Sequence, residues 1–309
     1  MRIAVAFFAA LLFCSPIATA QQSFDTTTPL VSRIGGEIPA WVNKANESMG
    51  RPELKTYTPT PAEMKKAEAA LALLTPLQKS VAQKHLRSFT FTDAADFNGQ
   101  ALRSGQGDDF KVDIIFNRII LSETTSDFLT RKERQLFDAS GSTIELTVDG
   151  GKLDAIDYVI LHEATHLVDY TLGITPRTMT MKGEIAEDAH TDFTRGIWQT
   201  AFTLAAPYED PIFRRVNFAP DRKTIPISEA KSLYEALGRT PLISIYATRM
   251  WGEDLAETVA WRQMEKLGQP YRVEIRDGSK VVYTFAPLKN PLVRARFGLL
   301  ARFDSADLQ

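Results

Sequence analysis

The sequence predicts an α+β protein in which a small sheet packs on one buried helix, with a mainly helical N-terminal part before it. Two observations lead to this prediction. Residues 153–161 form an apolar run that passes directly into His162-Glu163-Ala164-Thr165-His166, as expected of a helix buried on several sides. Upstream, segments rich in β-branched and aromatic residues predict strands at residues 89–92, 112–121 and 142–148.

The first twenty residues have the organisation of a secretory signal peptide. Arg2 gives a positive start, residues 3–13 are apolar, and Ala18-Thr19-Ala20 matches an A-x-A cleavage site. Cys14 follows Phe13 and not a small residue, so we expect no lipoprotein anchor. The prediction is therefore a secreted or periplasmic protein.

Composition excludes several classes of protein. The 309 residues are 44% hydrophobic and 24% charged, which is ordinary for a globular protein. A formal net charge of −2 gives no electrostatic footprint for nucleic acid. After the leader the chain has no cysteine and no apolar run of bilayer length, so we expect no disulfide and no stable membrane insertion.

The chain after the leader divides into two expected parts. Residues 21–60 are rich in Thr, Pro and Gly and predict an extended lead, followed by two helices over 62–74 and 77–86. His85, among lysines, is expected at the surface. We place the lead and this helical hairpin in residues 21–105 and the main domain in residues 106–309.

Within the main domain, turn residues separate the expected elements. Residues 96–109 contain three glycines and predict a loop, and Asn117-Arg118 interrupts the second strand. We expect helices over 129–137, 183–204, 227–237 and 291–303. Asp277-Gly278-Ser279 predicts a hairpin between strands 271–276 and 280–285.

The motif H-E-x-x-H organises the functional prediction. On a helix, His162 and His166 share a face and can present two imidazoles to one metal ion, for which zinc is well suited. Glu163 projects to one side and fits a general base acting on a water at the metal. The alternative is a pair of ordinary core histidines. Asp154 and Gly173 stand where the helix should begin and end.

A catalytic zinc site needs a third protein ligand. The compact H-E-x-x-H-x-x-G-x-x-H arrangement is absent, and the spare histidines His85 and His190 lie in unsuggestive contexts. Residues 251–261 predict a helix with Glu253 and Glu257 on one face. One carboxylate could bind the metal and the other could accept the free N–H of a ligating histidine. Two alternatives remain open at this point. The two glutamates could simply form a solvent-exposed face of the helix, or Glu257 could be the ligand in place of Glu253.

These motifs resemble the gluzincin class of zinc metallopeptidases, and locally the lethal-factor-like toxin peptidases. The resemblance lies in the H-E-x-x-H-x-V-D stretch that ends at Asp169, in Gly173, and in Glu253-x-x-Ala256-Glu257. It implies a zincin-like fold, with Glu253 as a metal ligand and Glu257 as the hydrogen-bond acceptor for a ligating histidine. It also implies Tyr246, seven residues before Glu253, as oxyanion donor.

Two of these residues have a plainer interpretation. Tyr246 could be an aromatic core residue, and Asp169 could either support a ligand or anchor the end of the motif helix. The overall expectation is an exported zinc metallopeptidase acting on a peptide or protein substrate. The alternative is a zinc-stabilised binding or inhibitory module without catalytic activity. An intact Glu163 favours the enzyme, because a structural site needs no base. The sequence makes no prediction of oligomeric state.

Overall fold

The computed structural model has the predicted α+β composition. It describes residues 25–48, 50–93, 97–105, 107–177, 179–180, 183–186, 189–218 and 223–308. The leader expected over residues 1–20 lies outside these described residues. In the part of the chain that is described, no helix combines the length and apolar character needed to cross a membrane.

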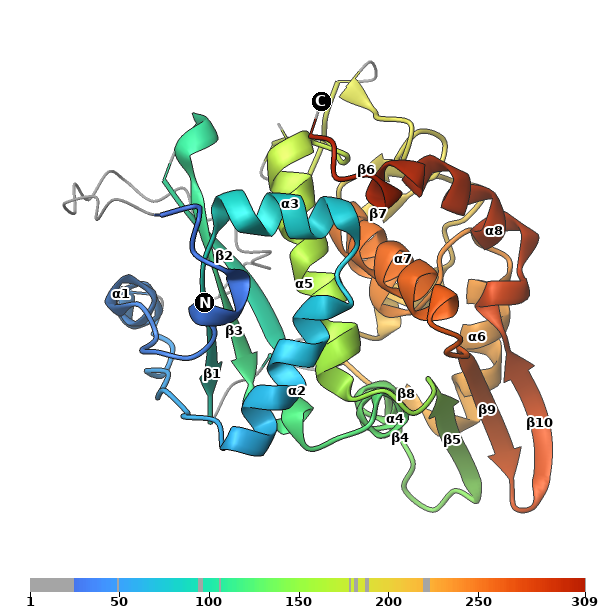
Figure 1. Ribbon diagram of the computed structural model, residues 1–309. Coiled ribbons are helices and arrows are strands. Elements are labelled where there is room, and N and C mark those ends of the chain that lie inside the picture. Colours follow the sequence, from blue (N-terminus) through green and yellow to red (C-terminus); the bar gives the residue numbers. More distant parts are fainter. Residues whose placement is uncertain are drawn as a thin grey trace.

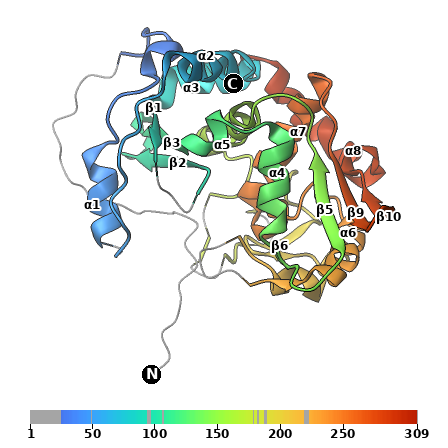
Figure 2. The same ribbon diagram turned by 90° about the horizontal axis from the view of Figure 1, so that it is seen from below.

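Helix α5 (Ala155–Leu172) runs through the centre of the molecule (Figures 1 and 2). It begins where the sequence predicts, since Asp157 accepts a hydrogen bond from the Asp154 backbone N–H at 3.1 Å. It ends at Gly173, which has a φ of 62° and so adopts the left-handed conformation that glycine tolerates best. The helix is buried from Ala155 to Thr165, and its partly exposed positions are His166 and the last four residues.

One sheet lies beside α5 and has the strand order β1-β3-β2 (Figure 1). Strands β1 (Leu86–Thr92) and β3 (Lys111–Asn117) are parallel, and β2 (Gly99–Ser104) is antiparallel to β3. Strand β2 corrects the loop expected over 96–109. Gly99 opens the strand, Gly105 follows its last residue, and every residue of the strand pairs with β3. The edge of the sheet at α5 is therefore β2.

A second sheet contains β5 (Ile144–Asp149), β9 (Arg272–Asp277) and β10 (Lys280–Phe285) in the order β10-β9-β5. The predicted hairpin is confirmed as β9 and β10. The single sheet expected from strands before the motif helix is wrong, because β5 pairs with the C-terminal hairpin. Alternation of residue types identifies a strand but not its partner, and this pairing joins distant parts of the chain.

Helices surround α5 on its remaining sides. The predicted hairpin is α2 (Pro61–Ala72) and α3 (Pro76–His85), and both pack on α5, as do α4 (Thr125–Arg134) and α7 (Trp251–Lys266) (Figure 1). The lead is less extended than expected, because it contains α1 (Ala40–Ser48). Buried Val42 tethers α1 to Leu102 and Ile115 of the first sheet, in a small cluster that local composition does not reveal.

The expected helix over 183–204 is wrong. Its described residues form turns and a small hairpin of β6 (Trp198–Thr200) and β7 (Thr203–Leu204). Thr194 Oγ1 accepts the backbone N–H of Thr191 at 3.1 Å, and Gly196 has a φ of 72°. Threonine hydroxyls that bond to the local backbone compete with helix formation, so polar turn chemistry outweighs the apolar content of the segment.

The C-terminal region follows the prediction more closely. Helix α6 (Ala230–Gly238) is present, and the basic helix is α8 (Pro291–Phe297), which changes to 3-10 geometry over Gly298–Asp304. Strands β4 (Phe137–Asp138) and β8 (Ile225–Pro226) form a short parallel pair. The other 3-10 helices are Leu30–Arg33, Gly107–Asp109, Arg118–Leu121, Pro211–Arg215, Ile227–Glu229, Tyr246–Arg249 and Pro287–Lys289.

The expected boundary between residues 105 and 106 falls inside the first sheet. Strands β1 and β2 precede it and β3 follows it. One hydrophobic cluster also extends from Ala67 of α2 to Phe303 near the C-terminus. The two sequence segments therefore share a core around α5.

Candidate metal centre

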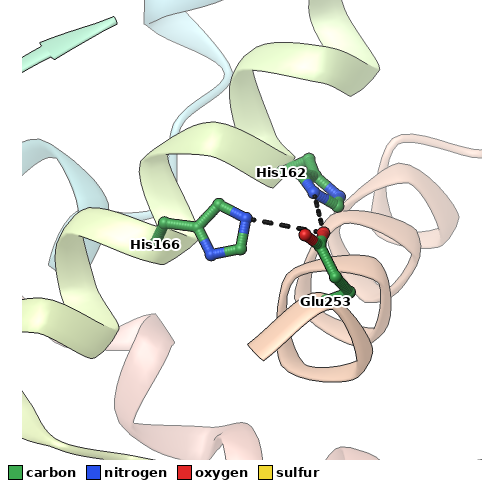
Figure 3. A group of neighbouring side chains, drawn as sticks. All are labelled: His162, His166 and Glu253. Atoms are coloured by element: carbon green, nitrogen blue, oxygen red, sulfur yellow. Dashed lines mark hydrogen bonds and ion pairs between the residues drawn. The ribbon is translucent and has the colours of Figure 1, made fainter. Parts of the chain in front are cut away.

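Three side chains with ligand atoms of metal-binding type converge between α5 and α7 (Figure 3). His162 and His166 project from α5 toward Glu253 of α7. His162 Nε2 lies 3.0 Å from Glu253 Oε2, and His166 Nε2 lies 3.7 Å from the same oxygen. One donor atom from each residue lies within 4.8 Å of the others. Of the candidate third ligands, the structure brings Glu253 to both histidines.

The packing of α5 against α7 produces this convergence. Positions four apart on α5 put both imidazoles on the face that meets α7. Glu253 lies in the first turn of α7, where backbone N–H groups favour a carboxylate. The next residue, Asp254, accepts hydrogen bonds from both terminal nitrogens of Arg296 at 2.7 Å, which fixes the start of the helix.

Glu257 lies one turn further along α7 and holds His162 from behind. Its Oε1 lies 2.9 Å from His162 Nδ1 and also accepts the hydroxyl of Tyr158. Its other oxygen accepts Ser244 Oγ at 2.6 Å. With Nδ1–H donating to Glu257, the nitrogen that faces Glu253 is Nε2, and loss of its proton leaves the form with Nδ1–H and a free Nε2 lone pair. This is the tautomer that a metal-ligating histidine requires.

Charge complementarity dominates the centre. Burial alone would lower the pKa of His162, but hydrogen bonds to Glu253 and Glu257 outweigh it and raise the pKa to about 10. Burial would raise the pKa of Glu253, and the two histidines instead hold it well below its usual range. Burial is likewise outweighed at Glu257, where Lys132 and His162 lower the pKa to about 2. The two glutamates are therefore anionic and attract positive charge.

Glu163 lies against Gly99 of the edge strand β2, close enough to the donor set for His162, His166 and Glu253 to affect its pKa. A Cβ built on Gly99 would lie 2.7 Å from Glu163 Oε1, so glycine makes room for this carboxylate. Burial raises the pKa of Glu163, while the two histidines and a hydrogen bond from the Ala101 backbone lower it in part. The group is thus a buried carboxylate with raised basicity, situated between the histidines and the edge of a sheet.

Tyr246 stands beside the donor set on the 3-10 helix Tyr246–Arg249. Its ring centroid is 5.8 Å from that of His162, and its hydroxyl accepts Arg249 Nη1 at 3.4 Å. Burial, with Glu253 nearby, raises the pKa of Tyr246. The phenol therefore stays protonated and can act as a hydrogen-bond donor.

Asp169 and the remaining histidines lie apart from the donor set. Both Asp169 oxygens accept from Thr175, at 2.7 Å from the backbone and 2.5 Å from the hydroxyl, which favours the role of anchoring the end of α5. His190 Nδ1 lies 3.3 Å from Thr194 Oγ1. The surface position expected for His85 is wrong. It is buried and stacks on Phe110, because the α3 face it occupies meets the first sheet.

Several residues at the centre escaped the sequence analysis. Tyr158 and Tyr170 continue the four-residue spacing of the histidines, so that four rings lie in a row along α5, and this signal was present in the sequence. Ser244, Gly99 and Lys132 come from other segments of the chain. Nothing in their local sequence marks them.

The chain was compared with protein-family models, with curated proteins and with solved structures, and none of them matches.

Proposed function

We propose that the protein is an exported, zinc-dependent peptidase of gluzincin type with a zincin-like catalytic domain. The observation that supports this most strongly is the convergence of His162, His166 and Glu253, with Glu163 alongside. Two imidazole nitrogens and one carboxylate oxygen are a donor set found in catalytic zinc sites, and they leave a coordination position for water. The zinc ion would supply Lewis-acid polarisation and make that water easier to deprotonate.

Each neighbouring residue has a task that its position supports. Glu163 takes the proton of the attacking water and delivers it to the leaving amine. Tyr246 donates a hydrogen bond to the carbonyl oxygen as negative charge develops on it. Glu257 fixes the orientation and tautomer of His162, and Ser244 and Tyr158 in turn hold Glu257.

A peptide substrate fits this arrangement because β2 is the edge of its sheet. An edge strand exposes backbone groups that pair with an extended chain. Glu163 lies against Gly99 of this strand, which would place a bound peptide next to the base. The substrate class we propose is therefore an extended peptide or an unfolded protein segment.

The test is hydrolysis of a generic unfolded protein by the chain lacking residues 1–20. We expect cleavage that a zinc chelator abolishes and added zinc restores. His162→Ala should remove both activity and bound zinc, whereas His190→Ala should retain both, since His190 bonds to Thr194 outside the donor set. Zinc binding without any cleavage of a broad peptide library would favour the binding or inhibitory module instead.

A further inference from the structure

A buried lysine lies against the ring of Tyr246. Lys132, on α4, is 8% exposed, and its Nζ lies 3.8 Å from the Tyr246 ring centroid and 5.4 Å from that of Phe218. Lysine is rarely buried so deeply without a carboxylate partner. Among the described residues, no carboxylate forms an ion pair with this ammonium group. Its short contact is with the face of an aromatic ring.

The two nearby carboxylates are hydrogen-bonded to other groups and do not draw the lysine away from the ring. Glu133, the next residue on α4, accepts a hydrogen bond from the Tyr234 hydroxyl at 2.7 Å. Glu257 on α7 is hydrogen-bonded to His162 and Ser244. Both carboxylates feel the positive charge of Lys132 at longer range. The ammonium group is consequently able to lie over the electron-rich face of the Tyr246 ring, where a cation is attracted.

The contact acts on a hydroxyl that already has another cation next to it. Arg249 donates to the Tyr246 oxygen at 3.4 Å, so one lone pair of that oxygen is engaged. The phenol hydrogen itself remains available for donation, and the tyrosine ring lies beside His162, with the ring centroids 5.8 Å apart. A positive charge over the ring stabilises electron density left on the oxygen, which makes the hydroxyl a stronger donor.

We infer that Lys132 is a positioning residue for Tyr246: its ammonium group holds the phenol ring in place and strengthens hydrogen-bond donation by the hydroxyl. This inference rests on the proposed function, because the hydroxyl matters most where negative charge develops on a substrate oxygen. Lys132 touches neither substrate nor metal ligand in this role. Its effect on the substrate oxygen is transmitted by the tyrosine, separately from its longer-range effect on Glu257.

Kinetics test the inference on the zinc-loaded protein. Lys132→Met should lower kcat about tenfold, with KM and zinc content unchanged, and Lys132→Arg should recover part of the loss. The decisive comparison uses Tyr246→Phe, in which adding Lys132→Met should cause no further decrease. If Lys132→Met slows the Tyr246→Phe protein as much as it slows the wild type, the lysine acts elsewhere and the inference is wrong.

A second measurement does not depend on activity. With 3-fluorotyrosine at position 246, the fluorine NMR resonance should move when Lys132→Met removes the nearby charge. Lys231→Met, which removes an exposed lysine on α6, should leave it in place. An unmoved resonance in Lys132→Met would overturn the inference even if the wild type is active. A moved resonance in a protein without hydrolysis would retain the contact and reject the proposed function. Lys132→Gln serves the same tests if Lys132→Met does not fold.

Discussion

Helix α7 carries two charged clusters on different faces, and the carboxylates in them are paired with different kinds of cationic group. Asp254 meets Arg296 through two hydrogen bonds of 2.7 Å and receives Trp198 Nε1 at 2.9 Å. An arginine is always charged, so this cluster carries a permanent cation of its own. The adjacent Glu253 instead contacts two imidazoles, which are neutral when they bind a metal.

This difference separates a structural cluster from a candidate metal centre. The Asp254–Arg296 pair joins α7 to α8, and Arg296 Nη1 also donates to the Pro241 carbonyl at 3.2 Å, so both terminal nitrogens of the arginine are engaged within the protein. Glu253 instead faces ring nitrogens of His162 and His166, and these three residues form a donor set that could hold a metal ion. The comparison predicts that substitutions on the face of Asp254, the structural face, change stability. Substitutions on the face of Glu253, the metal face, should change metal binding and activity.

The largest expected effect lies on the metal face. Glu163→Gln should lower kcat by about 10²–10⁴-fold, because the amide keeps the shape of the side chain but cannot accept a proton. Zinc content should equal that of the wild type, since Glu163 is not among the donors. Steady-state cleavage and elemental analysis measure the two quantities. Glu145→Gln, on the exposed side of β5, is the control. If the Glu163→Gln variant cleaves at the wild-type rate, Glu163 has no part in the mechanism.

The structural face should respond in the opposite way. Arg296→Met leaves Asp254 buried and unpaired and should lower the free energy of unfolding by about 3–5 kcal/mol. Arg294→Met, two residues earlier, loses an exposed pair with Glu265 and a contact with the Phe297 ring, and should cost about 1 kcal/mol or less. Urea unfolding in the presence of a chelator gives both values. Equal losses in the two variants, or a loss of zinc affinity in Arg296→Met with stability unchanged, would contradict the division of α7 into two faces.

A smaller effect is expected at Glu133, which borders the metal face. Burial raises its pKa to about 7, although Lys132 and Tyr234 oppose the shift. The folded state thus binds a proton more tightly than the unfolded chain. The stability gained is fully present below pH 4.5 and is lost as pH rises through about 7.

Replacing Glu133 by glutamine removes this dependence. The free energy of unfolding of Glu133→Gln, relative to that of the wild type, should rise by on the order of 1–3 kcal/mol between pH 5 and pH 8. Urea titrations of both proteins at the two pH values provide the difference, and the other titrating groups cancel because the proteins share them. A difference that stays constant with pH would show that Glu133 titrates normally in the folded state.

Local sequence signals were sufficient for α5 and its functional face. Asp154 and Gly173 mark its ends, and the spacing of His162 and His166 sets their common direction. The helix carrying Glu253 was equally accessible, because its apolar and acidic positions repeat at helical spacing. These features depend on residues within a few turns of one another, which explains why sequence reasoning found them.

Features that depend on distant partners could not be found in this way. The pairing of β5 with β9 and the burial of Lys132 against Tyr246 join segments far apart in the chain. The segment at 183–204 gave an apolar pattern without showing that Trp198 would be drawn to Asp254. Strand β2 was missed for a different reason, since the glycine that reads as a loop residue serves to admit Glu163.

The most direct test of the metal centre is zinc affinity, titrated against a competing chelator, for two variants of the same helix. Glu253→Ala should remove the third protein ligand and bind zinc far more weakly than Glu257→Ala, for which the loss of support behind His162 should cost about 10–100-fold. Glu265→Ala, near the C-terminal end of α7, should match the wild type. If Glu257→Ala proves the weaker zinc binder, the two carboxylates exchange roles. If neither variant differs from Glu265→Ala, then α7 contributes no ligand and the proposed centre is wrong.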